Sequence, residues 1–123
     1  MKKLMVGALV VSVAVFAGAS ALASGVPSHA GSAALIQRVT VSATEFKYVV
    51  NPKTAKRGIV IFKVTNIGKL KHDFEISRRK TPLLSHGQSA TLRVVFLRKG
   101  HYSYKCTVPG HAAAGMVGVF TIT

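Results

Sequence analysis

The only cysteine of the chain lies near the C-terminus, close to a histidine and a methionine. Cys106, His111 and Met116 follow one another at five-residue intervals. A thiolate, an imidazole and a weak thioether are the ligands that a soft, redox-active copper ion selects, and such a site needs one further histidine in trigonal geometry with the cysteine and the first histidine. His72 is the natural candidate. The sequence therefore predicts one copper ion held by His72, Cys106, His111 and Met116.

Each of these residues taken alone has a simpler structural explanation. A single inward histidine is commonly a hydrogen-bonded core residue, a single cysteine is commonly a small buried hydrophobic residue, and a methionine fills gaps in a core. A Cys–His nucleophile is formally possible with Cys106 and His111, but no carboxamide that would orient the histidine is identifiable in the Gly-Pro loop between them. The specificity of the metal prediction lies in the combination of residue types, spacing and placement.

The N-terminal segment has the pattern of a secretory signal peptide. Lys2 and Lys3 precede an uncharged apolar run, and Ala21-Leu22-Ala23 fits a small-x-small cleavage site. We therefore expect residues 1–23 to be a cleaved signal peptide and the protein to be periplasmic or otherwise exported. An uncleaved membrane anchor is the alternative, but the apolar part is shorter than the roughly 20 residues that span a bilayer comfortably. In an oxidising compartment, Cys106 is then either a buried bystander or a metal-bound thiol, because it has no internal disulfide partner.

The remainder of the chain divides into a linker and one domain. Residues 24–34 have linker composition, and residues 35–123 fit a single compact domain. Short alternating segments rich in Val, Ile, Thr, Phe and Tyr, broken by Gly, Pro and Asn, predict an all-β fold, whereas no window has helical periodicity. Six or more short strands at this spacing indicate a β-sandwich with Greek-key connections. The expected strands are residues 38–42, 59–65, 72–76, 90–96, 100–105 and 117–123.

The strand period of two places two of the candidate ligands on apolar faces. Residues i and i+2 share a face of a strand. His72 therefore shares its face with Phe74, while Asp73 is expected to point the other way. By the same rule, Cys106 shares its face with Tyr104. Both candidate ligands are thus expected on the inward faces of their strands.

From residue 56 to residue 123 the chain resembles the cupredoxins, the small blue copper proteins of the plastocyanin/azurin type, and especially their small exported bacterial members. Three stretches carry the resemblance, and the last of them is the most specific. They are GIVIFKVTNIG (58–68) with KHDF (71–74), GQSATL (87–92) with GHYSYKC (100–106), and CTVPGH (106–111) with GMVG (115–118).

The resemblance implies two packed sheets with copper at one end, bound by His72, Cys106 and His111 in one plane and by Met116 as a weak axial ligand. Asp73 departs from the pattern, because many relatives carry asparagine beside the first histidine, where its amide helps to tie the ligand loops together. An ionised carboxylate cannot donate a hydrogen bond, so the contribution of Asp73 is left open. The loop from Cys106 to His111 is also longer than in plastocyanins.

The resemblance implies single-electron transfer by a type 1 copper site. The alternative is a periplasmic copper carrier or delivery protein with the same fold, but such proteins often have methionine-rich sites, and Met116 is the only methionine after the predicted signal peptide. No enzyme is expected. Multicopper oxidases and copper nitrite reductases need several such domains and further histidine clusters, and a binuclear copper site needs a second cysteine. His29, His86 and His101 form no His-x-His pair.

Charge gives the expected partner class. The chain has 17 Lys and Arg residues against three acidic residues, a formal net charge of +14. This charge favours transient, salt-sensitive association of a monomer with an acidic redox protein such as a cytochrome or an oxidase. We expect His111 to be the electron port, because small apolar residues flank it in the loop, namely Pro109, Gly110 and residues 112–114. Weak attraction to anionic membrane surfaces and an ordinary solvated basic surface are the alternatives. Nucleic-acid binding is not expected, because the basic runs lack interleaved aromatic residues.

Overall fold

The computed structural model describes residues 35–123, and this part of the chain is all-β, as the alternation predicted. The predicted signal peptide (1–23) and linker (24–34) lie outside the described residues. Residues 35–123 contain no helix, and so none with the length and hydrophobicity that a membrane crossing requires. The strands are β1 (Ile36–Thr44), β2 (Lys47–Asn51), β3 (Thr54–Ala55), β4 (Gly58–Asn66), β5 (Glu75–Ile76), β6 (Arg79–Lys80), β7 (Ser89–Phe96), β8 (Gly100–Lys105) and β9 (Val117–Ile122).

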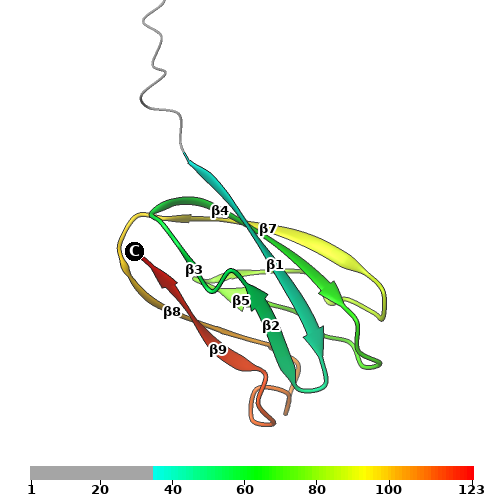
Figure 1. Ribbon diagram of the computed structural model, residues 1–123. Coiled ribbons are helices and arrows are strands. Elements are labelled where there is room, and N and C mark those ends of the chain that lie inside the picture. Colours follow the sequence, from blue (N-terminus) through cyan, green and yellow to red (C-terminus); the bar gives the residue numbers. More distant parts are fainter. Residues whose placement is uncertain (1–34) are drawn as a thin grey trace, which may run out of the picture. The chain divides into compact units, whose positions relative to one another are not determined.

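The strands form two sheets that pack as a sandwich (Figure 1). One sheet has the order β2-β1-β4-β7, and the other has the order β3-β9-β8-β5-β6. β1 pairs in parallel with β4, and β3 pairs in parallel with β9, whereas the remaining pairs are antiparallel. Strands that are neighbours in each sheet are often distant in sequence, which is the Greek-key arrangement that the sequence predicted.

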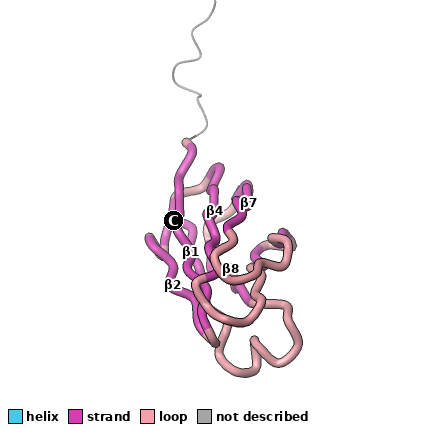
Figure 2. Tube along the Cα trace, turned by 90° about the vertical axis from the view of Figure 1, so that its right-hand side faces the viewer, coloured by secondary structure: helices cyan, strands magenta, loops and turns pink. Residues whose placement is uncertain are grey.

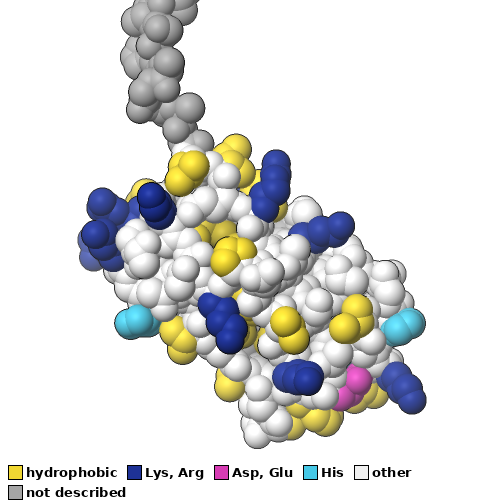
Figure 3. Space-filling view, viewed as in Figure 1, with side chains coloured by type: hydrophobic (Ala, Val, Ile, Leu, Met, Phe, Trp, Pro, Cys, Tyr) yellow, Lys and Arg dark blue, Asp and Glu magenta, His cyan; other side chains and the backbone are white. Residues whose placement is uncertain are grey.

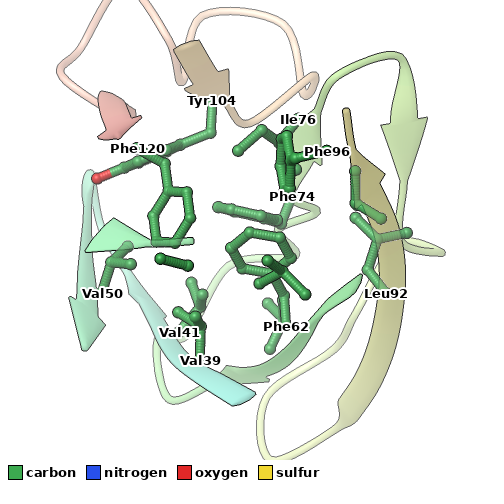
Figure 4. Packing of buried hydrophobic residues seen from close by; sticks show 14 of the residues in the cluster. Val39, Val41, Val50, Phe62, Phe74, Ile76, Leu92, Phe96, Tyr104 and Phe120 are labelled. Atoms are coloured by element: carbon green, nitrogen blue, oxygen red, sulfur yellow. The ribbon is translucent and has the colours of Figure 1, made fainter. Parts of the chain in front are cut away.

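Aromatic side chains fill the space between the two sheets (Figure 4). Phe62 of β4, Phe96 of β7 and Phe120 of β9 are fully buried together with Phe74. Ring centroids lie 5.2 Å apart for Phe62 and Phe120 and 5.4 Å apart for Phe62 and Phe74, distances at which aromatic rings attract one another. The core therefore fixes the segment that follows His72, because Phe74 is anchored between the sheets.

Three connections meet at one end of the sandwich. Figure 1 shows the β1–β2 turn and the long loop between β8 and β9 at the same end, and Figure 2 shows loops gathered there. The loop after β4 joins them, since the backbone N–H groups of Ile67 and Gly68 donate to the carbonyl oxygen of Ala43, at 3.0 and 3.2 Å. This end of the sandwich contains all the candidate ligands.

The predicted strand over residues 72–76 is largely wrong. Only Glu75–Ile76 pairs regularly, as β5, and His72 forms an isolated bridge with Leu84. The chain leaves strand geometry here because the N–H of Phe74 donates to the Thr81 hydroxyl, at 3.1 Å, rather than to a neighbouring strand. Strand β2 was not predicted at all.

Candidate metal centre

His72 is held by the backbone on both sides of its α-carbon. Its N–H donates to the carbonyl oxygen of Leu84, at 3.1 Å, and its carbonyl oxygen accepts from the N–H of Leu84, at 2.8 Å. The side chain is completely buried. A histidine fixed in this way has little freedom to leave the site, so its imidazole is presented in one position.

The buried side chain of Asn66 organises the loop that leads to His72. Its amide nitrogen donates to the carbonyl oxygens of Leu70 and Leu84, at 2.8 and 2.7 Å, and its carbonyl oxygen accepts from the N–H of Gly68, at 2.8 Å. Asn66 therefore ties three backbone groups of the loop to one buried side chain. No sequence pattern predicted this contribution of Asn66.

The loop from Cys106 to Met116 is closed on itself by backbone hydrogen bonds. The N–H of Cys106 donates to the carbonyl oxygen of Met116, and the N–H of Met116 donates to the carbonyl oxygen of His111, both at 3.1 Å. Gly110 and Gly115 have φ angles of +84° and +122°, a region that favours glycine. The loop thereby brings three residues that are five positions apart to one place.

The donor atoms of the two histidines and the cysteine lie side by side. His72 Nδ1 and His111 Nδ1 are 3.1 Å apart, and Cys106 Sγ is 3.6 Å from His111 Nδ1. One donor atom from each of the three residues lies within 4.8 Å of the other two, which is close enough to share a single metal ion. His72 and Cys106 are buried, and His111 is partly exposed.

Met116 lies beside this group. Its side chain is completely buried in a small cluster with Cys106 and Ala43. The backbone bonds to Cys106 and His111 fix its position in the loop. His72, Cys106, His111 and Met116 are thus brought together from two separate parts of the chain.

Asp73 is buried, and this corrects the prediction that it points away from the core. It is 4% exposed, and its carboxylate accepts from the N–H of Thr107, at 2.6 Å, and from the hydroxyl of Thr107. The alternation rule fails because residues 72–74 are not in a regular strand. The carboxylate therefore links the segment of the first histidine to the cysteine loop, and it does so purely as an acceptor.

Glu45, in the turn between β1 and β2, is a neighbour of the site that the sequence patterns did not predict. Its Oε1 atom lies 3.2 Å from Nε2 of His72 and 2.6 Å from the N–H nitrogen of Leu70. The hydrogen bond from the Leu70 N–H, opposed in part by burial, lowers the pKa of Glu45 to about 2. The one feature of the sequence that could have pointed to Glu45 is its rarity, because it is one of only three acidic residues in a strongly basic chain.

Tyr48 supports the site from β2. Its hydroxyl donates to the carbonyl oxygen of Asp73, and its ring packs edge-on against Phe74 and Tyr104, with centroids 5.3 and 5.6 Å apart. Burial, with a smaller contribution from the neighbouring Cys106, raises the pKa of Tyr48 far above its usual value of 10. Burial also raises the pKa of Tyr104. Both phenols therefore stay neutral at physiological pH.

The partly exposed edge of the site is apolar, and the wider surface is basic. Phe46, beside Glu45 in the turn, packs against the His111 ring with centroids 5.1 Å apart and is itself exposed, as are Leu70 and Pro109. Figure 3 shows Lys and Arg side chains spread over the face in view, with acidic atoms near its lower end. The predicted collar of small residues around His111 therefore includes a larger aromatic member.

The other two histidines of the described residues lie elsewhere. His86 bonds through Nδ1 to the carbonyl oxygen of Gly68, at 2.7 Å, and exposed His101 bonds through Nδ1 to the Thr121 hydroxyl, at 3.0 Å. Neither belongs to the group of donor atoms described above. His29 lies outside the described residues.

Comparisons with known proteins agree with this geometry. Residues 34–123 match the family model described as copper binding proteins, plastocyanin/azurin family. The chain is 28% identical over 116 residues to the copper-resistant cuproprotein CopI of Rubrivivax gelatinosus, a match that covers 76% of this chain and 70% of that protein.

Solved structures show the same fold at low sequence identity. A dithionite-reduced auracyanin from the photosynthetic bacterium Roseiflexus castenholzii superposes with a TM-score of 0.62 at 20% identity, covering 71% of this chain and 97% of that one. A multicopper oxidase superposes with a TM-score of 0.57 at 14% identity, covering 71% of this chain but only 44% of the oxidase. At these identities the superpositions show the fold alone.

Proposed function

Because the chain belongs to the plastocyanin/azurin family of copper-binding proteins, we propose that it is an electron carrier that binds one copper ion through His72, Cys106, His111 and Met116. The observation that carries the proposal is the grouping of the histidine and cysteine donor atoms within 4.8 Å of one another. Bound at this site, copper supplies one-electron chemistry by alternating between Cu(I) and Cu(II).

The donor set suits copper rather than a hard cation. A thiolate, two imidazoles and a thioether are soft or borderline ligands, whereas magnesium and calcium prefer oxygen. Buried Cys106 and Met116 offer sulfur from inside the fold, and His72 offers nitrogen. The four side chains together form an arrangement like that of a type 1 copper site.

The surrounding hydrogen bonds favour rapid electron transfer because they limit rearrangement. His72 is fixed through Leu84, and Cys106 and Met116 are fixed through the loop backbone. The bonds from Thr107 to Asp73 add a second link between the two ligand segments. Side chains that are held in place before and after electron transfer add little reorganisation to the barrier.

His111 is the proposed electron port. It is the partly exposed member of the set, exposed Phe46 packs against its ring, and exposed Pro109 lies two residues before it in the loop. An apolar patch allows a partner to approach the imidazole closely, and the basic surface around it favours an acidic redox protein such as a cytochrome or an oxidase. We expect transient association of a monomer, with a rate that falls as ionic strength rises.

The same proposal includes export of the protein from the cytoplasm and the lack of an enzymatic activity. The pattern of residues 1–23 supports export, and a redox carrier with a buried thiolate suits an oxidising compartment. The fold likeness to a multicopper oxidase covers less than half of that protein, so the fold alone gives no support for an oxidase reaction here. We therefore propose a carrier rather than an enzyme.

Copper delivery is the second candidate, and the similarity to a copper-resistant cuproprotein favours it. A delivery protein must release its ion, so its ligands have to separate easily. The complete burial of His72 and Met116 argues for retention of the ion through turnover instead. The two functions use the same ligands and differ in how quickly the ion leaves.

Visible spectroscopy of the mature protein tests the proposal. After addition of Cu(II), we expect an intense thiolate-to-copper band that bleaches on mild reduction and returns on oxidation, with one copper per chain. His111→Ala should weaken or alter the band, and His101→Ala, which changes an exposed histidine outside the site, should leave it intact. Copper that binds without this band and passes readily to a chelator would favour delivery instead.

A further inference from the structure

The carboxylate of Glu45 lies against the backbone of the loop that follows β4. The Leu70 N–H donates to Oε1 at 2.6 Å. A β-carbon added to Gly68 would lie 2.6 Å from Oε1 and 2.8 Å from Oε2, closer than any side chain permits. Gly68 is itself fixed, because its N–H donates to the side chain of Asn66 and to Ala43. The absence of a side chain at Gly68 thus leaves the space in which the carboxylate lies.

In this position, the carboxylate of Glu45 determines which ring nitrogen of His72 carries the proton. An ionised carboxylate only accepts hydrogen bonds, so the Nε2 atom of His72, 3.2 Å from Oε1 of Glu45, must be the donor. The proton on Nε2 leaves the lone pair on Nδ1. That atom is the one that faces Nδ1 of His111 and the sulfur of Cys106.

The placement of acidic residues in the chain adds an independent observation. Against 17 Lys and Arg residues, the chain has only Glu45, Asp73 and Glu75. Glu45 contacts a proposed copper ligand, and Asp73 bonds to the residue after another. A basic surface disfavours additional positive charge at the site, and a carboxylate against the imidazole offsets part of that effect.

We infer that Glu45 is a positioning residue of the metal centre, which holds His72 with Nδ1 toward the ion and favours the oxidised over the reduced ion. This inference rests on the proposed copper site. A histidine bound to Cu(II) is a stronger hydrogen-bond donor than one bound to Cu(I), so the bond to the carboxylate strengthens on oxidation. The negative charge also favours the ion of higher charge. Both effects lower the reduction potential.

Three variants separate the charge from the shape of the side chain. Glu45→Gln keeps the size and an acceptor oxygen but removes the charge, and Glu45→Asp keeps the charge but withdraws it by one methylene group. Glu75→Gln is the matched control, since it removes the same charge from β5, where Glu75 lies opposite Lys105. Each copper-loaded variant is titrated electrochemically while the visible band is followed, and thermal unfolding checks that it is folded.

We expect Glu45→Gln to lower the affinity for Cu(II) relative to Cu(I) about tenfold, the lower end of the range for a partner of a ligating histidine. A tenfold change is a rise of about 59 mV in a one-electron potential. Glu45→Asp should fall between this variant and the wild type, and Glu75→Gln should shift the potential less. A shift in Glu45→Gln no larger than that in Glu75→Gln would overturn the inference.

A measurement on the wild-type protein keeps the inference testable if a variant does not fold. In the Cu(I) form, nitrogen-15 NMR should show the Nε2 proton of His72 shifted downfield and exchanging more slowly than that of the partly exposed His111. Equal chemical shifts and equal exchange rates for the Nε2 protons of His72 and His111 would contradict the contact with Glu45. Absence of the blue band from the wild-type protein would instead refute the proposed function itself.

Discussion

Replacing Asp73 by alanine tests whether the two ligand segments are joined by its carboxylate. Asp73 is buried and accepts the N–H and the hydroxyl of Thr107, so the variant leaves both donors without their partner. Asparagine is the matched variant, because its carbonyl oxygen can still accept from the Thr107 N–H while its amide group can donate to the hydroxyl oxygen. The pair therefore separates loss of the link from loss of the charge.

The expected cost follows from the two hydrogen bonds. Bonds to a charged group contribute about 1.5–3 kcal/mol each, and water partly replaces them here because Thr107 is not fully buried. We therefore take the lower value for each bond and expect Asp73→Ala to reduce the free energy of unfolding by about 3 kcal/mol. For a domain of this size, that corresponds to a fall in Tm of about 12–24 °C. Asp73→Asn should cost about 1 kcal/mol or less.

Urea denaturation of the copper-free protein measures these values, with the slope m checked for a constant change in exposed surface. Thr107→Val removes the hydroxyl and keeps the backbone donor, so it completes a double-mutant cycle with Asp73→Ala. The combined loss should be smaller than the sum of the two single losses, by about 0.5–3 kcal/mol. Additive losses, or a loss below about 1 kcal/mol for Asp73→Ala, would refute the proposed link.

Three further predictions concern the ligands and Tyr48. Cys106→Ser should abolish the intense visible band while leaving the fold intact by circular dichroism, and a variant that stays blue would contradict the ligand assignment. Met116→Leu should retain copper and raise the reduction potential, because a thioether is replaced by a group that donates no electrons, as voltammetry would show. The raised pKa of Tyr48 means that above about pH 10 the unfolded chain loses a proton that the native protein keeps, so stability falls as pH rises. Urea denaturation at about pH 9 and about pH 11 should show a larger loss in the wild type than in Tyr48→Phe, and equal losses would exclude this contribution.

Regular strands and the ligand loop were predictable because their signals are local. The alternation in β4, β7, β8 and β9 follows directly from which residues are buried, and these strands lie within one or two residues of their predicted limits. The spacing of Cys106, His111 and Met116 is likewise a property of one short segment. The family match over residues 34–123 confirms the predicted resemblance.

The environment of His72 was not predictable from local patterns. Asp73 is buried because residues 72–74 pair with side chains and with Leu84, contacts that depend on segments about ten residues away in the chain. Glu45 reaches His72 across 27 positions, through a turn whose following strand, β2, was not expected. A single carboxylate in a turn has no pattern of its own, so its role became visible only when the fold placed it against an imidazole.

The separation of the two charge signs in this chain has a mechanistic consequence. Lysine and arginine side chains are spread over the face shown in Figure 3, where ions screen them within about 10 Å at 0.1 M salt, so we expect them to act mainly on the encounter with the proposed partner. Glu45 and Asp73 contact the ligand segments directly, and we expect them to act on the ion because of that proximity. Neutralising Lys105, an exposed residue of β8, should therefore change the salt dependence of the association rate more than the reduction potential, whereas Glu45→Gln should do the reverse. If the proposed function holds, the affinity for the partner and the reduction potential can then change independently of each other.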